Sequence, residues 1–189
     1  MTGEVRRLSV QYPGGLAARY RWGGTGSAQD VFSISEGDGA LHDLGSLAGA
    51  ALDSMCRAEL RVEGPVGRWT LRLASPIYDE PEAVFLDTHG LLVVRYGFRV
   101  YALSARTGDL AWSQASGTPS VAILASSRLD HVVLQTEVET LALRADGSIA
   151  WRAAHSDVVV EARLIADRLD LTTYSGEHLY LDARTGQSA

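Results

Sequence analysis

Three copies of one short pattern decide the fold of this chain: Tyr101-Ala-Leu-Ser-Ala-Arg-Thr-Gly-Asp-Leu-Ala-Trp112, Leu141-Ala-Leu-Arg-Ala-Asp-Gly-Ser-Ile-Ala-Trp151 and Leu179-Tyr-Leu-Asp-Ala-Arg-Thr-Gly-Gln-Ser-Ala189. Each copy is a run of alternating apolar residues followed by a turn that contains glycine. The turn glycines Gly108, Gly147 and Gly186 are separated twice by 39 residues. A fixed period of this length is the signature of a repeat architecture.

Two further apolar runs precede each copy, and they keep their order from one copy to the next. The earlier runs cover residues 83–86, 121–125 and 162–166, and the later runs cover residues 91–94, 131–134 and 169–172. Gly and Asp stand at the turns between the runs, where positive φ angles are needed, and β-branched residues occupy the runs themselves. Residues 79–189 are therefore predicted to form three repeats of four short strands each, with a period of about 39 residues.

Trp112 and Trp151 follow their turns at the same step of 39 residues, and a third Trp would fall one residue beyond Ala189. A large planar side chain on an outer strand can wedge between neighbouring sheets and bury on the order of 200 Å². A period near 40 residues with four strands in each unit is typical of a propeller blade, as in WD40-like repeats. The predicted fold class is therefore mainly β, a partial or small β-propeller-like array.

The turn followed by tryptophan resembles the tryptophan-docking repeat of pyrroloquinoline-quinone-like β-propellers, over residues of about 80–189. The matching residues are Ala102, Thr107, Gly108 and Trp112 in the first copy, Ala142, Gly147 and Trp151 in the second, and Asp182, Thr185 and Gly186 in the third. Ser104 stands where those repeats usually carry Asp. The quinone-dependent dehydrogenases of this family use about eight blades around their cofactor and metal. This chain has three recognisable copies, a single Cys and no Asn, so we expect no quinone cofactor and no metal.

Residues 1–78 lack the repeat and predict an α+β segment. The expected elements are two hairpins, a strand and a helix, over residues 8–22, 60–73, 30–34 and 44–55 respectively. Asp43 is the expected N-cap of the helix. The two prolines and the acids of residues 76–82 break both periodicities. The predicted domains are therefore 1–78 and 79–189.

Three sheets of this kind do not close a ring, and an unpaired sheet edge invites aggregation. The N-terminal segment could complete the last repeat with its own strands, or it could contribute divergent blades. A second molecule could instead cover the open edge. We favour an N-terminal segment packed on the repeats, and a homodimer stays an open alternative.

The composition excludes several classes of chemistry. All 17 basic residues are Arg, because the chain has no Lys, and this excludes a lysine Schiff base and a phosphate-binding loop with its Lys. The single Cys56 cannot form an internal disulfide. The net charge of −6 disfavours nucleic acid and anionic membranes as partners. No apolar run is long enough to span a membrane and the start lacks a secretion signal, so we expect a cytoplasmic protein of bacterial type.

Two groups of charged residues are candidates for binding ions. Glu36, Asp38, His42 and Asp43 carry ligand types that suit a divalent cation. Turn and capping chemistry explains both aspartates, however, so we predict no metal site. A set of arginines offset from the apolar positions of the hairpins could share one outward face and bind anions: Arg7, Arg19, Arg21, Arg61, Arg68 and Arg72. The interleaved Glu59 and Glu63 favour a solvated face instead.

In a propeller, the turns between second and third strands lie on one rim, together with the connections between blades. These turns carry Tyr96 and Phe98 in the first repeat, Glu137 in the second, and Tyr174 and His178 in the third. Aromatic residues held at tight turns are favoured anchors of protein interfaces. We therefore predict that these five residues form the binding surface for a protein partner.

The predicted function is a non-enzymatic protein-interaction module, for example an immunity protein, an antitoxin or an accessory subunit. The alternative is a small-molecule-binding protein or an enzyme, with its pocket between the two halves of the chain. His178, Glu137 and Glu177 would then be the acid–base candidates.

Overall fold

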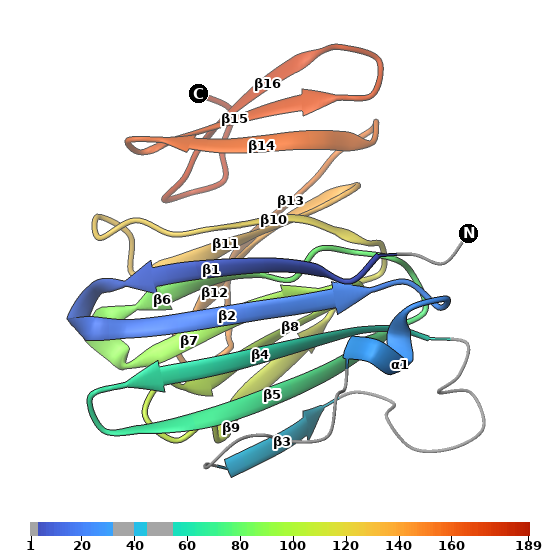
Figure 1. Cartoon of the computed structure of the whole chain (residues 1–189). Helices are drawn as coiled ribbons and strands as arrows, with labels where there is room; N and C mark the ends of the chain where they lie inside the picture. Colours follow the sequence, from blue (N-terminus) through green and yellow to red (C-terminus); the bar gives the residue numbers. More distant parts are fainter. Residues whose placement is uncertain (1–3, 32–39, 45–54) are drawn as a thin grey trace.

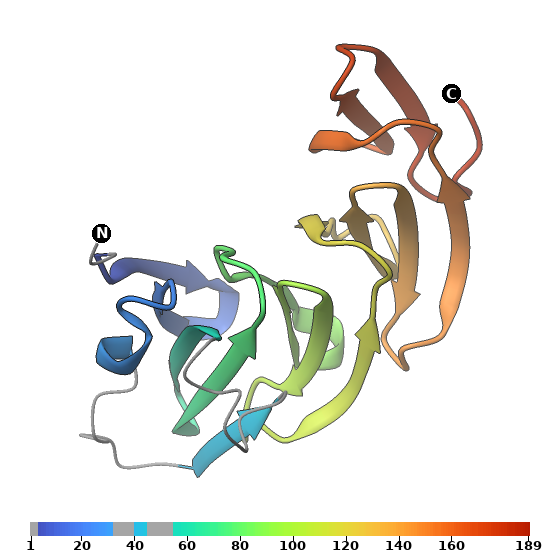
Figure 2. The ribbon, with the colours of Figure 1, turned by 90° about the vertical axis from the view of Figure 1, so that its right-hand side faces the viewer.

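A computed structural model describes residues 4–31, 40–44 and 55–189 of the chain. These residues form four β-sheets that follow one another in chain order (Figure 1). Turned by 90°, the row of sheets is an arc, with the first sheet at one end and the last at the other (Figure 2). The chain is mainly β, as predicted, and the sheets are arranged like the blades of an open β-propeller.

The N-terminal segment forms a five-stranded sheet with the strand order β1-β2-β4-β5-β3. Its strands are β1 (Arg6–Tyr12), β2 (Leu16–Gly23), β3 (Ala40–Leu44), β4 (Cys56–Gly64) and β5 (Gly67–Ser75). A 3-10 turn, η1 (Pro13–Gly15), joins β1 to β2, and a short helix, α1 (Ala28–Val31), follows β2. Both predicted hairpins are present, because their alternating apolar residues turn one face toward the core.

Two expectations for this segment were wrong. Asp30 and Val31, predicted to lie in a strand, belong to helix α1, whose single turn packs the fully buried Val31 against Gly23 of β2. Asp43 lies within β3, opposite Arg72 of β5, because this stretch adds as a parallel strand to the edge of the sheet rather than starting a helix. The remaining positions of these two predictions, residues 32–34 and 45–54, lie outside the described residues.

The three repeats follow as three separate antiparallel sheets. The first consists of β6 (Glu82–Leu86), β7 (Leu91–Tyr96), β8 (Arg99–Ser104) and β9 (Leu110–Ala115), with a 3-10 turn, η3 (Asp87–His89), after β6. The second consists of β10 (Ser120–Leu124), β11 (His131–Thr136), β12 (Glu139–Arg144) and β13 (Ile149–Ala154). The third consists of β14 (Val159–Ile165), β15 (Arg168–Thr173) and β16 (His178–Asp182).

The third repeat therefore has three strands where four were predicted. An isolated antiparallel bridge joins Leu181 to Ser188. In the first repeat the corresponding pair, Leu103 and Leu110, starts the fourth strand. The bridge between Leu181 and Ser188 therefore occupies the position at which the fourth strand starts in the first repeat.

Each repeat is joined to the next by the tryptophan of its outer strand. Trp112 of β9 donates its indole N–H to the carbonyl oxygen of Ala145 over 2.8 Å. Gly147, in the same turn, leaves the space that this ring fills, since a Cβ there would lie 2.8 Å from the indole. Trp151 of β13 lies against Gly186 in the same way. The predicted tryptophan wedge is thus present at both junctions between repeats.

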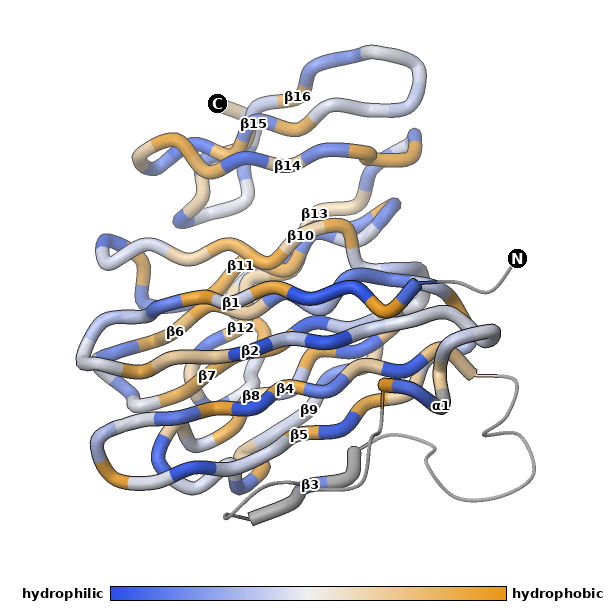
Figure 3. The backbone as a smooth tube through the Cα atoms, in the orientation of Figure 1, coloured by the Kyte–Doolittle hydropathy of each residue, from blue (hydrophilic) through white to orange (hydrophobic). Residues whose placement is uncertain are grey.

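Hydrophobic layers fill the spaces between successive sheets. The second strands of the first two repeats, β7 and β11, are buried along nearly their whole length, and Figure 3 shows hydrophobic residues along these two strands. Both faces of these sheets are covered, because each sheet lies between two others. The stability of the array therefore depends on contacts between neighbouring sheets.

The last sheet turns a polar face outward. In the second strand of the first two repeats, one buried valine packs against the following sheet: Val93 in the first repeat and Val133 in the second. The equivalent position of the third repeat, on the outward face of the last sheet, is Asp170. Arg168 Nε lies 2.6 Å from Asp170 Oδ1, and the Arg168 guanidinium lies 4.8 Å from the centroid of the Tyr180 ring.

The first sheet also turns a polar face outward. Arg7, Arg21, Glu59 and Arg72 are neighbours in register across β1, β2, β4 and β5, so they share one face, as the sequence analysis expected. The Glu59 carboxylate, whose side chain is 1% exposed, accepts hydrogen bonds from Arg61 Nε at 2.9 Å and from Arg72 Nε at 3.4 Å. The single carboxylate of Glu59 is therefore shared by two of the arginines on this face.

Candidate functional site

The first strands of the four sheets, β1, β6, β10 and β14, lie along the concave side of the arc (Figure 2). The outer strands β9 and β13 lie along the convex side. In a closed propeller the inner strands line a central channel. Here the arc is open, so the edges of these strands are accessible from the concave side.

Strand β1 is the most exposed of these inner strands. It is the edge strand of its sheet, and among residues 4–31, 40–44 and 55–189 it pairs with β2 alone. Residues 6–9 are exposed, and Val10 and Tyr12 are partly buried. Leu8 is 43% exposed, a large value for an apolar residue whose neighbours in register, among them Tyr20, are buried. An exposed edge with alternating apolar residues is a template for pairing with another chain.

A cavity of about 470 Å³ separates β1 from β6. Strands β1 and β2, the connection between β5 and β6, and the first repeat supply its lining: Leu8, Val10, Tyr12, Tyr20, Glu80, Pro81, Glu82, Ala83 and Arg95. The cavity therefore lies between the two halves of the chain, where the alternative functional prediction expected a pocket.

Two tyrosine hydroxyls lie at one side of this cavity. Tyr12 Oη donates a hydrogen bond of 3.3 Å to the carbonyl oxygen of Ala83, so Tyr20 Oη, 2.5 Å away, donates to Tyr12. Burial raises the pKa of both hydroxyls above the usual tyrosine value. Both groups therefore stay protonated, and they connect the first sheet to β6 by hydrogen bonds.

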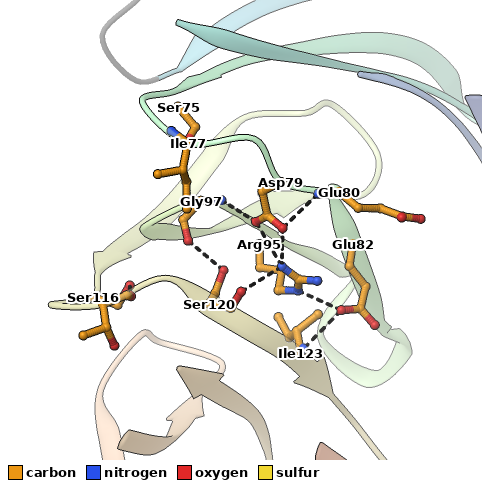
Figure 4. A network of polar contacts seen from close by, with 11 residues as sticks. Ser75, Ile77, Asp79, Glu80, Glu82, Arg95, Gly97, Ser116, Ser120 and Ile123 are labelled. Carbon is orange, nitrogen blue, oxygen red and sulfur yellow. Dashed lines mark hydrogen bonds and ion pairs between the residues drawn. The ribbon is translucent and has the colours of Figure 1, made fainter. Parts of the chain in front are cut away.

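Arg95 of β7 is the centre of a polar network at the other side of the cavity (Figure 4). Its Nε lies 2.8 Å from Glu82 Oε2 and its Nη1 lies 3.0 Å from Asp79 Oδ2. Nη1 also donates to the carbonyl oxygen of Ser120 at 3.1 Å. Arg95 is only 7% exposed. The network thus joins the first repeat, the connection that precedes it and the second repeat at a single buried guanidinium.

The charge around Arg95 is not balanced. Asp79, Glu80 and Glu82 are three carboxylates within four residues of sequence, and Arg95 is the one guanidinium that contacts two of them. The group therefore carries a net charge of −2. Glu80 is exposed and lines the cavity, and no ion pair of its carboxylate occurs among the described residues.

A second cavity of about 500 Å³ continues along β1. Its lining residues are Glu4, Val5, Arg6, Arg7, Leu8, Trp22 and Glu80, so it shares Leu8 and Glu80 with the first cavity. We refer to the two cavities together as the β1–β6 groove. It follows the free edge of β1, with Glu80 at its middle.

The turns that the sequence analysis predicted as a binding surface lie on the rim with the connections between sheets. The Glu137 N–H donates to the carbonyl oxygen of Pro119 at 3.1 Å, and the Tyr174 N–H donates to that of Val158 at 2.7 Å. The Gly97 N–H donates to Asp79 Oδ2 at 2.7 Å. Each turn thus fastens one sheet to the connection before it.

The side chains of the predicted surface have different environments. Tyr96 is 2% exposed and belongs to the core, where burial raises the pKa of its hydroxyl, and it lines a small pocket together with Phe98. Phe98 and Glu137 are partly buried, and Phe98 lines a small pocket of about 100 Å³. Tyr174 is 82% exposed, and His178 is exposed, with Nδ1 3.4 Å from Thr172 Oγ1. Each repeat holds its own part of this set, and the β1–β6 groove contains none of the five.

The charged cluster at residues 36–43 is described only in part. Glu36 and Asp38 lie outside the described residues. His42 Nε2 lies 3.0 Å from the carbonyl oxygen of Thr107, and its ring packs edge-on against Trp69. Among the residues described, no group of three or more His, Cys, Asp or Glu side chains could hold a metal ion. The same residues contain no helix that is long and apolar enough to cross a membrane.

Comparison with known proteins supports the fold. No protein-family model matches the sequence, and a search of curated proteins gave no match. The solved structure of BamB from Moraxella catarrhalis has a TM-score of 0.54 at 14% identity, over 100% of this chain and 66% of BamB. The computationally designed Ika8 has a TM-score of 0.53 at 12% identity, over 71% of this chain and 45% of its own. The designed Ika4 has a TM-score of 0.50 at 11% identity, over 79% of this chain and 95% of its own.

These likenesses show a shared fold, a β-propeller type of repeat, at identities that do not extend to function. The chain spans about two thirds of BamB and less than half of Ika8.

Proposed function

We propose that this chain is a non-enzymatic protein-interaction module and that its partner binds in the β1–β6 groove. The observation that carries the proposal is the exposed edge of β1, where the apolar Leu8 lies open beside the cavity. Exposed apolar surface next to a concave site marks interaction surfaces in soluble proteins. The propeller type of fold supports the same reading, because it presents a large, rigid surface on a scaffold of buried strands.

A small-molecule ligand is the second candidate. The first cavity has the volume of a typical small-molecule site, and the tyrosine hydroxyls and Glu82 would give such a ligand fixed polar contacts. The acid–base candidates of the sequence analysis do not support an enzyme here, since the lining of this cavity contains none of His178, Glu137 and Glu177.

The finer assignments are also proposals. The tryptophan contacts at the turns support a pyrroloquinoline-quinone-like type of repeat. We also propose that the chain is a cytoplasmic bacterial protein that acts as an immunity protein, an antitoxin or an accessory subunit. Each of these roles requires a surface for a protein partner such as the β1–β6 groove. A homodimer is less well supported, because the outward faces of the first and last sheets are polar and contain ion pairs.

The experiment that tests the proposal compares Leu8→Arg with Ile165→Arg. Leu8 is 43% exposed in the groove, and Ile165 is 53% exposed on β14 at the far end of the arc, so the two changes are chemically matched. A partner captured from the native cell would be purified, and its affinity for each variant measured. We expect Leu8→Arg to weaken binding at least tenfold, about 1.4 kcal/mol, and Ile165→Arg to change it less than twofold.

A third variant tests the rim that the sequence analysis predicted. Tyr174→Ala removes its most exposed aromatic side chain. If Tyr174→Ala abolishes binding and Leu8→Arg does not, the groove is the wrong site. A metabolite that remains bound to the purified protein and is lost from Leu8→Arg would favour the small-molecule candidate.

A further inference from the structure

We propose that the occupant of the β1–β6 groove is an extended polypeptide segment that adds to β1 as a further strand and carries one basic side chain to Glu80. This inference rests on the proposed function and adds to it the conformation and the chemistry of the partner. Three separate features of the groove lead to it: the free backbone edge of β1, the alternation of its side chains and the charge at Glu80.

The backbone of β1 determines the conformation of the partner. Within the described part of the chain, the backbone groups of residues 4–12 bond to β2 alone. The opposite edge of β1 therefore has free N–H and C=O groups along a strand of seven residues. An extended segment satisfies such groups by strand addition, whereas a helix cannot, since its own backbone bonds are already made.

The side chains of β1 determine the pattern of the partner sequence. Leu8, Val10 and Tyr12 alternate along β1 and line the cavity. Residues directly opposite one another on paired strands point to the same face. Every second residue of an added strand would therefore enter the cavity beside Leu8 and Val10, where Ala83 and Pro81 form the opposite wall. Apolar residues at alternate positions suit this lining.

The carboxylates determine the charge of the partner. Arg95 contacts Asp79 and Glu82, which leaves the exposed Glu80 to a basic group from outside. The carboxylate of Glu80 repels a phosphate group that is placed beside it and attracts a guanidinium or an ammonium group. Arg6 and Arg7 line the far part of the groove and would repel a second basic residue there. The complementary segment therefore has a single basic residue near its middle.

The test is an NMR titration of the ¹⁵N-labelled full chain with short synthetic peptides. The main probe is Gly-Ser-Val-Ser-Arg-Ser-Val-Ser-Gly with blocked ends, which places one arginine between two valines on the same face of an extended strand. One comparison peptide has Glu in place of the arginine, and a second has N-methyl groups on all backbone amides of its residues 3 to 7. The N-methyl groups remove the backbone donors that strand addition requires without changing the side chains.

We expect the arginine peptide to shift the amide signals of β1 and of Ala83, and the Glu peptide to bind at least fivefold more weakly. Glu80→Gln should remove most of the difference in affinity between the two peptides. Glu63→Gln, on the outward face of the first sheet, should leave that difference unchanged. The N-methylated peptide should not shift β1. Equal affinity for the arginine and Glu peptides, or shifts of β1 by the N-methylated peptide, would overturn the inference.

The peptide titration can fail while the proposed function still holds, and the two failures can be told apart. If Leu8→Arg weakens the native partner but the arginine peptide leaves β1 unchanged, the groove is the site and its occupant is not a basic strand. If Leu8→Arg leaves the native partner bound, the proposed function itself fails.

Discussion

Trp69 donates its indole N–H to the carbonyl oxygen of Ala105 over 3.0 Å, and through this contact the first sheet is fastened to the first repeat. Trp112 makes the corresponding bond of 2.8 Å to Ala145 in the next repeat. A Cβ on Gly108 would lie 2.7 Å from the Trp69 ring, as one on Gly147 would approach Trp112. The N-terminal sheet therefore packs on the repeats as each repeat packs on the next, although its sequence lacks the repeat.

The first prediction compares two of the docking tryptophans, Trp69 and Trp151. Trp69→Phe removes the hydrogen bond to Ala105 and part of a ring that is 2% exposed, so we expect the free energy of unfolding to fall by about 2 kcal/mol. The Trp151 indole nitrogen is buried without a hydrogen-bond partner among the described residues. Trp151→Phe should therefore cost less, about 1 kcal/mol. Urea unfolding measures both, and an equal loss would show that the hydrogen bond contributes nothing.

The second prediction separates ring docking from backbone conformation. Gly147 and Gly176 both have positive φ angles, +84° and +87°, but only Gly147 has an indole where its Cβ would lie. Gly176→Ala should cost about 1 kcal/mol for the left-handed conformation. Gly147→Ala should cost about 3 kcal/mol, because the Trp112 ring must also move. Thermal or urea unfolding provides the comparison, and similar losses for the two variants would rule out close docking of Trp112.

The third prediction concerns the buried guanidinium beside the groove. Arg95→Met leaves the carboxylates of Asp79 and Glu82 without their cation, and it removes the bond to the Ser120 carbonyl oxygen. We expect the free energy of unfolding to fall by about 2 kcal/mol, because Asp79 stays largely buried without its cation whereas the Glu82 side chain is 43% exposed to water. The double variant with Glu82→Gln should be less destabilised than the sum of the single variants. If urea unfolding shows that the losses in free energy of unfolding from the two single variants simply add, Arg95 and Glu82 are not coupled.

The fourth prediction is a pH dependence at the last junction. Hydrogen bonds from Ser175 and from the Val158 N–H lower the pKa of Asp157 to about 2, below its ordinary value of 3.8. A lowered pKa gives stability that is complete above the unfolded value and is lost as the pH falls through about 2. Asp157→Ala should therefore be less stable than the wild type at pH 5 to 7.

The difference between Asp157→Ala and the wild type should narrow between pH 4 and pH 2, as the wild-type carboxylate becomes protonated. Unfolding measured across this range is the test. A gap that stays constant over the range would contradict the pKa assigned to Asp157.

The repeats and their tryptophan wedges could be predicted from the sequence because their signals are local. Glycine at a turn and alternation within a strand each involve a few neighbouring residues. Trp69 was missed because it precedes Trp112 by 43 residues, not 39, and its turn partner Gly108 had been assigned to the first repeat alone.

The prediction that Tyr96 is exposed at its turn was wrong, because its side chain is buried. Its place beside Gly97 predicted an exposed side chain. Tyr96 instead continues the alternation of Leu92 and Val94, which face the first sheet, and all three belong to the same core cluster. The alternation of β7 was visible in the sequence and would have placed Tyr96 inside.

The groove could not be predicted from local patterns. It forms where β1 meets residues 80–83, about 70 positions further along the chain. Alternation identifies β1 as a strand, but it does not reveal which strand of the sheet is the edge that faces the concave side. That arrangement is fixed by the packing of whole sheets.

Hydrogen–deuterium exchange of the full chain, with and without its purified partner, tests the central claim most directly. Binding in the groove predicts that new protection is concentrated in β1, at residues 6–12, and in β6, at residues 82–86. The turn at residues 174–178 should exchange at the same rate in both states. Protection confined to that turn, with β1 unchanged, would contradict the account.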